Sequence, residues 1–432
     1  MRAISLALRR RDLRLLLTSG LISTTGDWVL MIGLTYSVYA LTGSTLASAL
    51  TLLTSYVPQI LLGSLAGVFV DRWDLRRTMI AADLLLAAGL LPLLAVHRPG
   101  QIWIVYCVCA WQGCVQQFFG PAEKSLLPHV IDDEHLVTAN ALNSQSGDLS
   151  RLVGSALGGL VAAVGGITLL ALVDAASFLG SAGLTALIRS GRAPLARTGG
   201  GELRARVGRI RAEWAEGLRL TVRHRVLRIL GVFVLITCVG EGIMGTLFAP
   251  FVRTSLHAGA GVYGVIGGAQ AVGGICGGLL AASLGDRLPA ARALGCCALA
   301  FGAIDLALFL YPLAYVAAWP AIVLMIVVGF PGALLTAAMM TLFQRNTTVS
   351  HRGRVFGALG ALEGVAAVAG ALAAGLLGAG LGIIPTLAAQ GGGYVVAGLL
   401  VLAALRPSAG DGAALGEPGE NLGEGVKVLS GE

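Results

Sequence analysis

Five acidic residues lie within long apolar stretches of the sequence, where they are well placed to do chemistry. They are Asp27, Asp148, Glu241, Asp305 and Glu363. If these stretches cross a bilayer, each ionised acid at its centre costs about 2.5–3.5 kcal/mol on insertion scales. Five such acids facing lipid would cost roughly 12 kcal/mol or more, which is comparable to the stability of a whole domain. They must therefore be protonated, paired with a cation or turned towards water. Because burial favours the neutral form of a carboxylic acid, each can bind and release a proton.

Two polar pairs in these stretches share a helix face. Asp148 and Arg151 are three residues apart, so they can form a structural ion pair or act directly on a bound solute. Gln112 and Gln116 are four residues apart. Their amides offer neutral hydrogen bonds to a bulky ligand or to water.

The composition indicates a membrane protein. Charged residues make up 12% of the chain and apolar residues 56%, whereas globular proteins carry about 25% charged residues. Apolar runs long enough to cross a bilayer, about 20 residues each, recur along the sequence. We predict an all-α protein with twelve membrane-spanning helices at residues 15–41, 46–70, 78–97, 102–122, 139–165, 167–189, 227–252, 259–284, 292–315, 317–343, 355–380 and 383–405.

The placement of positive charge predicts the orientation. Among the 30 lysines and arginines, all but Arg98, Arg151 and Arg253 lie in the segments on the side of the N-terminus or at the span ends that border them. Such asymmetry predicts that both termini are cytoplasmic in the cell membrane. It also accounts for the net charge of +7 without a nucleic-acid partner. The seven cysteines lie in or beside the spans without a Cys-x-x-Cys pair, so we expect no metal site and no disulfide framework.

Three polar landmarks recur at a nearly constant offset, which indicates a duplicated architecture. Gly26-Asp27 corresponds to Gly240-Glu241, Asp71-Arg72 to Asp286-Arg287, and Asp148 to Glu363. An even number of spans per repeat gives both halves the same orientation. We predict a cytoplasmic basic arm at 1–14, an N-terminal six-helix bundle at 15–189, a cytoplasmic linker with an amphipathic helix at 190–226, a C-terminal six-helix bundle at 227–406 and a disordered cytoplasmic tail at 407–432.

The loop between the second and third spans resembles a signature of the major facilitator superfamily. Gly67, Asp71, Arg72, Arg76 and Arg77 match that signature. An aspartate, Asp74, stands where the general pattern has a second glycine. In this respect the loop is similar to the drug:proton antiporter branch that includes macrolide efflux proteins and the enterobactin exporter. Gly154, Gly158 and Gly159 resemble the small-residue motif of the fifth helix in antiporters, with Ser155 in place of its proline.

The resemblance implies the major facilitator fold, in which two six-helix bundles are related by a pseudo-twofold axis. It implies that the first and seventh helices line a central cavity, which would give Asp27 and Glu241 a role in binding substrate or protons. Glu363 would lie at the interface between the halves. Asp174 and Asp305 would lie on peripheral helices, packed against partners.

The resemblance also implies a conformational latch between the halves. Asp71 would cap the N-terminus of a helix in the other half, and Asp286 with Arg287 would form a weaker counterpart. The alternative is that the arginines of this loop only set the membrane topology. Asp83, two turns into the third span, is positioned to bind Arg76 or Arg77 from within.

Three functions are compatible with these features. The first is proton-coupled export of an amphipathic small molecule, such as a drug, siderophore or secondary metabolite, by alternating access. The second is import of a small solute by the same fold, and the third is a membrane enzyme or lipid-handling protein. The chain lacks a nucleophile elbow, a zincin helix and a nucleotide-binding loop around Lys124 or Lys427. We therefore expect no enzymatic activity, no cofactor and no nucleotide. The expected partners are a small-molecule substrate, protons and the lipid bilayer. We expect the protein to be a monomer.

Overall fold

The computed structural model describes residues 10–70, 73–131, 136–189, 216–284, 289–347 and 349–405. In these ranges the long elements are all α-helices, joined by short loops and 3₁₀ turns. They are α2 (Arg11–Thr42), α3 (Thr45–Val70), α4 (Leu75–Leu90), α5 (Ile102–Val130), α6 (Leu136–Ala186), α8 (Arg225–Thr254), α9 (Ala260–Leu284), α10 (Ala290–Leu310), α11 (Trp319–Arg345), α12 (Val349–Gly380) and α13 (Ile383–Ala404).

The helices follow the predicted apolar spans. α6 contains two helical segments, because Gly166 adopts φ 57° and ψ −151° and interrupts the helix. Glycine reaches this backbone conformation without the penalty that a side chain would add. The break coincides with the predicted boundary between spans 139–165 and 167–189. In the described ranges, ten helices are long and apolar enough to cross a membrane, with the two segments of α6 counted as one.

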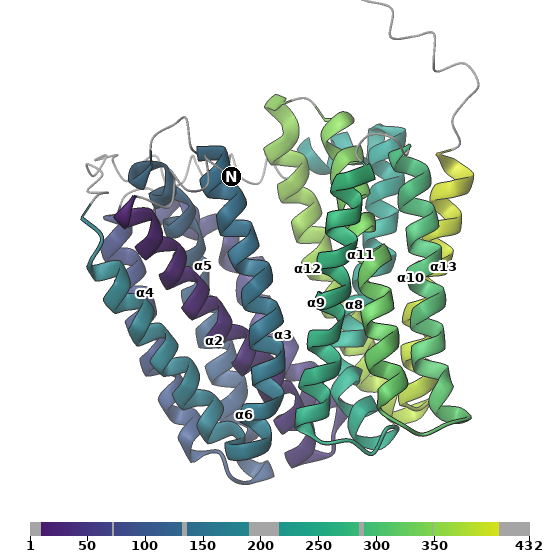
Figure 1. Cartoon of the computed structure of the whole chain (residues 1–432), viewed down its shortest axis with the longest axis horizontal. Coiled ribbons are helices and arrows are strands. Elements are labelled where there is room, and N and C mark those ends of the chain that lie inside the picture. Colours follow the sequence, from purple (N-terminus) through teal and green to yellow (C-terminus); the bar gives the residue numbers. More distant parts are fainter. Residues whose placement is uncertain are drawn as a thin grey trace, which may run out of the picture.

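The chain forms two halves that lie side by side (Figure 1). One half contains α2 to α6 and the other contains α8 to α13, and each has its own cluster of buried apolar residues. In each half the first helix packs along the last, α2 along α6 and α8 along α13.

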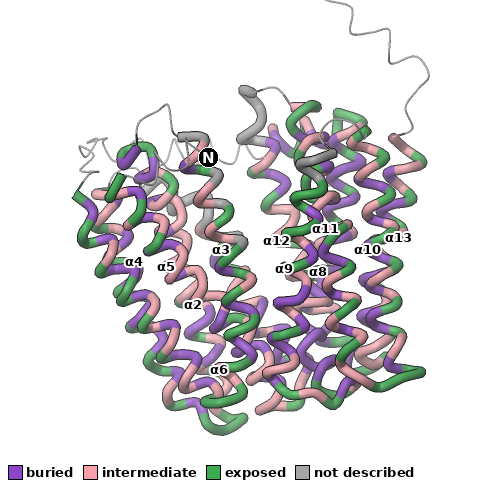
Figure 2. Tube along the Cα trace, in the orientation of Figure 1, coloured by how far each residue is buried: buried purple, intermediate pink, exposed green. Residues whose placement is uncertain are grey.

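Large apolar side chains cover the outside of both halves. Figure 2 shows exposed residues along the outer sides of the helices and buried residues between them. Val164, Leu279 and Leu376 are 74%, 70% and 66% exposed. Exposed leucine and valine on this scale are unfavourable in water, but they suit helices surrounded by lipid.

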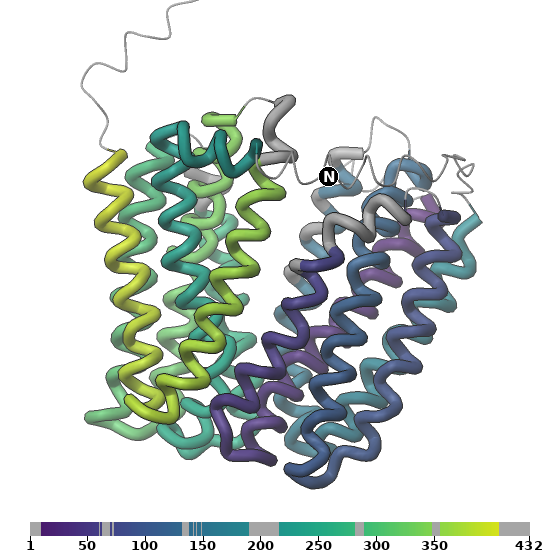
Figure 3. Tube along the Cα trace, turned by 180° about the vertical axis from the view of Figure 1, so that it is seen from behind, coloured from purple at the N-terminus to yellow at the C-terminus, as the bar shows by residue number. Residues whose placement is uncertain are grey.

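The halves contact each other at the end of the bundle that lies away from the N-terminus. α6 packs against α9, and α3 packs against α12. The Tyr36 hydroxyl donates to the Ala258 carbonyl at 3.3 Å, and the Thr45 hydroxyl donates to the Gly375 carbonyl at 2.9 Å. Towards the N-terminal end the halves diverge, as Figures 1 and 3 show.

Several predicted segments lie outside the described residues. They are the first nine residues of the basic arm, residues 190–215 of the linker, residue 406 at the end of the C-terminal bundle, and the tail at 407–432. The latch residues Asp71, Arg72, Asp286 and Arg287 also lie outside the described residues. α8 begins at Arg225, within the predicted linker and two residues before the predicted span.

Candidate functional site

Asp27 lies near the midpoint of α2 and is half-buried. Its Oδ2 accepts a hydrogen bond from the amide of Gln116 on α5 at 2.8 Å. The preceding residue, Gly26, allows α6 to approach closely, since a Cβ there would collide with Asp174 and Ser177. The pairing of Asp27 with Gln116 joins two of the polar residues that the sequence places within spans.

Two fully buried acids lie behind Asp27. Asp174 on α6 accepts from the Ser177 hydroxyl at 3.2 Å through Oδ1, while its Oδ2 has no partner in the described part of the chain. Asp83 on α4 faces the Ser181 hydroxyl of α6, but neither carboxyl oxygen makes a hydrogen bond of normal geometry among the described residues. A buried carboxyl group without a donor costs least when it is protonated.

The predicted contact between Asp83 and the loop arginines is wrong. Arg76 instead donates to backbone carbonyls at the end of α6, from Nε to Thr185 at 3.2 Å and from Nη2 to Ala186. Arg77 lies next to Asp74. Because both arginine side chains lie at helix ends, they do not extend to Asp83, which is about two turns further along α4.

Glu241 lies near the midpoint of α8, and its side chain is exposed although Gly240 and Gly242 beside it are buried. Its Oε1 accepts from the Tyr394 hydroxyl of α13 at 2.6 Å. Arg151 on α6 of the other half adds positive charge to the surroundings of Glu241, although the two side chains form no ion pair in the described part of the chain. Glu241 is therefore anchored in its own half by Tyr394, and the positive charge of Arg151 in the opposite half favours its ionised form.

The C-terminal half also contains a buried carboxyl–amide pair. Asp305 on α10 is 2% exposed and accepts from the Gln390 amide on α13 at 2.8 Å through Oδ2. This contact agrees with the expectation that Asp305 packs against a partner. Glu363 on α12 is half-buried and makes no hydrogen bond with the residues that the structure describes.

Gln112 and Gln116 contact different helices. The amide of Gln112 donates to the Leu86 carbonyl of α4 at 3.4 Å, whereas Gln116 binds Asp27. The Oε1 atoms of both glutamines are buried and lack a partner in the described residues. Both amides thus make contacts within the fold in this structure.

Arg151 is exposed on α6, and the side chain of Asp148 lies outside the described residues. The predicted ion pair between them stays a prediction.

The glycines that follow on α6, Gly154, Gly158 and Gly159, occupy two interfaces. A Cβ on Gly154 or Gly158 would collide with the α2 backbone near Thr25 and Val29.

Gly159 lies at the interface between the halves. A Cβ on Gly159 would lie 2.6 Å from both N and Cα of Gly264 on α9. The small-residue motif therefore allows α6 to pack on α2 within its own half and on α9 of the other half. Close backbone approach of this kind is the usual role of small residues in membrane helices.

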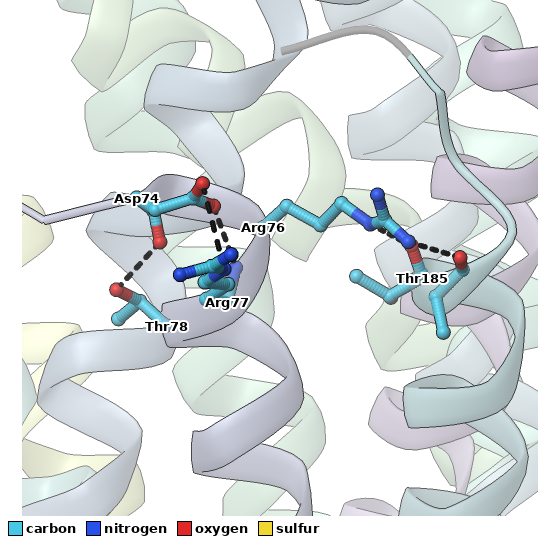
Figure 4. A network of polar contacts seen from close by, with 6 residues as sticks. Asp74, Arg76, Arg77, Thr78 and Thr185 are labelled. Atoms are coloured by element: carbon cyan, nitrogen blue, oxygen red, sulfur yellow. Dashed lines mark hydrogen bonds and ion pairs between the residues drawn. The ribbon is translucent and has the colours of Figure 1, made fainter. Parts of the chain in front are cut away.

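The described part of the predicted latch stabilises helix ends within one half (Figure 4). Arg76 caps the C-terminal carbonyls of α6, a position where positive charge is favourable. Asp74 is the N-cap of α4, and its Oδ1 accepts from the Arg77 backbone N–H at 2.9 Å. Gly67 lies near the end of α3, where only the backbone is described.

Sequence reasoning missed Tyr394, Gln390 and the capping role of Asp74. An aspartate just before a helix is a recognised capping signal, so the role of Asp74 was accessible from the sequence. Tyr394 and Gln390 lie in an apolar span, and their positions give no indication of which acids they contact.

The sequence is similar to those of known transporters. The model of a family described as transmembrane secretion effector matches residues 5–416. The multidrug efflux pump Tap of Mycobacterium tuberculosis is 27% identical over 386 residues, which is 86% of this chain and 88% of Tap. Macrolide efflux protein A of Streptococcus pyogenes is 25% identical over 148 residues, covering 34% of this chain and 36% of that protein. The uncharacterized MFS-type transporter YfiS of Bacillus subtilis is 28% identical over 174 residues, covering 40% of this chain and 41% of YfiS. The last two alignments span less than half of each relative.

Solved structures share the fold at low sequence identity. A bacterial homologue of the iron transporter ferroportin, in an inward-facing state, matches with a TM-score of 0.71 and 14% identity over 91% of this chain and 98% of that one. The nucleoside transporter NupG matches with a TM-score of 0.70 and 14% identity over 92% of this chain and all of NupG (100%). These similarities show the fold alone.

Proposed function

Because this chain belongs to the transmembrane secretion effector family of the major facilitator superfamily, we propose that it is a proton-coupled exporter of amphipathic small molecules that works by alternating access. The position and contacts of Glu241 give this proposal its main support. It is an exposed acid at the middle of a membrane-spanning helix, bonded to Tyr394 of its own half and attracted by Arg151 of the other. An acid that is bonded in one half and attracted by a cation of the other can couple its protonation to the relative position of the halves.

The proposed cycle uses competition between a proton and a cationic group of the substrate. When Glu241 is ionised, the Tyr394 hydroxyl stabilises its charge, and the carboxylate attracts both Arg151 and a positively charged substrate. When Glu241 binds a proton, both attractions weaken, so the substrate is released and the halves are free to rearrange. Release of the proton to the cytoplasm restores the binding form.

Asp27 provides a second acid in the N-terminal half. The Gln116 amide holds its carboxyl group in position, and Asp174 lies beside it across the α2–α6 contact. The repeat places Asp27 and Glu241 at corresponding positions of the two halves. We propose that both face the substrate pathway, Glu241 as the coupling acid and Asp27 as its counterpart.

The balance of charges favours a neutral or cationic substrate. Asp27, Glu241 and Glu363 contribute acids near the middle of the bundle, and Arg151 is the basic residue well within a described span. An importer of anionic nutrients would need more binding cations. Efflux pumps among the relatives, Tap and macrolide efflux protein A, also support export over import.

The test uses the full-length protein reconstituted in liposomes with an imposed pH gradient. Ethidium serves as the amphipathic cation, and its movement is followed by fluorescence. We expect Glu241→Gln and Asp27→Asn each to reduce gradient-driven ethidium transport at least tenfold. Glu216→Gln, which removes an acid outside the long helices, should leave transport unchanged. If both cavity variants transport ethidium at the normal rate under the gradient, the coupling assignment is wrong.

A further inference from the structure

A cavity lies on the side of the N-terminal half that faces away from the C-terminal half. It has a volume of about 560 Å³, which is within the range of small-molecule sites. It is formed by the end of α4, the 3₁₀ turn Leu91–Ala95 and the start of α5. Figure 1 shows α4 and α5 in the half formed by the earlier part of the chain, where α4 lies at its outer edge.

The lining of this cavity suits a hydrocarbon chain. Leu85, Ala88, Pro92 and Trp103 are among its lining residues, and the indole N–H of Trp111 is already used in a 3.0 Å hydrogen bond to the Leu85 carbonyl. A site for a drug-like molecule usually contains a few convergent polar groups that orient the ligand. This lining offers no charged group, so the cavity is suited to an acyl chain.

The cavity opens towards the membrane near the end of two spans. Leu85 and Trp103 are 48% and 60% exposed, although both lie in segments that cross the bilayer. Tryptophan at the end of a membrane-spanning helix is typical of the lipid headgroup level. A lipid in the same leaflet can therefore reach the cavity without leaving the membrane.

A positive charge lies in the loop that joins the two sides of the cavity. Arg98 is exposed in the loop between the lining residues Ala95 and Trp103. The loop is held by Gln101, whose Oε1 accepts from the backbone N–H groups of His97 at 2.9 Å and Arg98 at 3.1 Å. The predicted topology makes Arg98 one of only two basic residues in the loops on the outer side, so its charge is not explained by the positive-inside rule.

We propose that the cavity binds an anionic phospholipid of the outer leaflet, with one acyl chain between α4 and α5 and the phosphate next to Arg98. Lipid tails are as apolar as the cavity lining, so transfer of the chain gains little from the hydrophobic effect. Selectivity comes from the headgroup charge, and retention comes from close packing of the chain. The inference is independent of the transport cycle proposed above.

The experiment is native mass spectrometry of the purified full-length protein. The protein is exposed to equal amounts of phosphatidylglycerol and phosphatidylcholine with identical acyl chains. We expect one retained phosphatidylglycerol per protein. Ala88→Phe places a ring in the cavity from an exposed position on α4, and should reduce retained phospholipid about tenfold. The matched control Ala81→Phe puts the same ring two turns away on α4, outside the lining, and should retain lipid as the unaltered protein does.

A second pair of variants tests the headgroup contact. Arg98→Gln should reduce the preference for phosphatidylglycerol about fivefold, the effect of one basic residue at a membrane surface. Arg253→Gln removes the other basic residue of the outer side and should leave the preference unchanged. Equal lipid retention by Ala88→Phe and Ala81→Phe would overturn the proposal. So would displacement of the bound lipid by ethidium, since the cavity would then be an entry site for transported molecules.

Discussion

A single methyl group at Gly159 should shift the balance between the two orientations of the halves. Gly159→Ala would place a Cβ 2.6 Å from the N and Cα atoms of Gly264, against the backbone of α9. Non-bonded carbon atoms pack at about 3.5–4.0 Å, so α6 and α9 would have to separate by about 1 Å. Overpacking of this kind costs about 1–3 kcal/mol. Because the contact exists only where the halves are joined, this cost shifts the ratio of the two states by about 5–150-fold.

The assay measures the distance between the halves at the joined end. Spin labels are attached at Val164→Cys and Thr254→Cys, two exposed positions in opposite halves, after replacement of the seven native cysteines. Gly159→Ala should increase the population with a long inter-label distance. Gly268→Ala is the matched control, because a Cβ there meets Ala156 Cβ of the same interface at an ordinary 3.5 Å.

The comparison between the two variants decides the outcome. If Gly159→Ala and Gly268→Ala give the same distance distribution, the backbone contact does not hold the halves together. The reasoning from helix approach at this interface would then be refuted.

Three further predictions concern the loop between α3 and α4 and the first turn of α4. Arg76→Gln removes the charged donors to the α6 carbonyls and should lower the free energy of unfolding, measured by denaturation in micelles, by about 1–2 kcal/mol. Arg77→Gln is the control, because the ion pair of Arg77 with Asp74 is exposed and 4.0 Å long. It should change the free energy of unfolding by less than about 0.5 kcal/mol. Asp74→Ala removes the N-cap of α4 and should cost about 1 kcal/mol in the same measurement, and an unchanged unfolding curve would contradict the capping role. Asp71→Asn should slow ethidium transport in liposomes without lowering thermal stability if the residue is part of a latch; normal transport would remove support for the latch.

The sequence by itself determined the membrane architecture and the list of acids. Apolar runs of about 20 residues must be helical in lipid, because a helix satisfies its own backbone hydrogen bonds. The positions of the apolar runs are therefore enough to locate the helices. The recurrence of Gly26-Asp27 as Gly240-Glu241 was enough to indicate two similar halves. The cost of charge in lipid singled out the intramembrane acids before any contact was known.

The tertiary structure decided which group each acid contacts. Glu241 binds a tyrosine 153 residues away, and Asp305 binds a glutamine 85 residues away. Local spacing fixes neighbours on one helix face, but it does not say which helices lie side by side. For the same reason the sequence suggested arginines as partners for Asp83, although those side chains cap helix ends or remain exposed. Gly159 likewise is a small residue in the sequence, and only the packing of α6 against α9 makes it a contact between the halves.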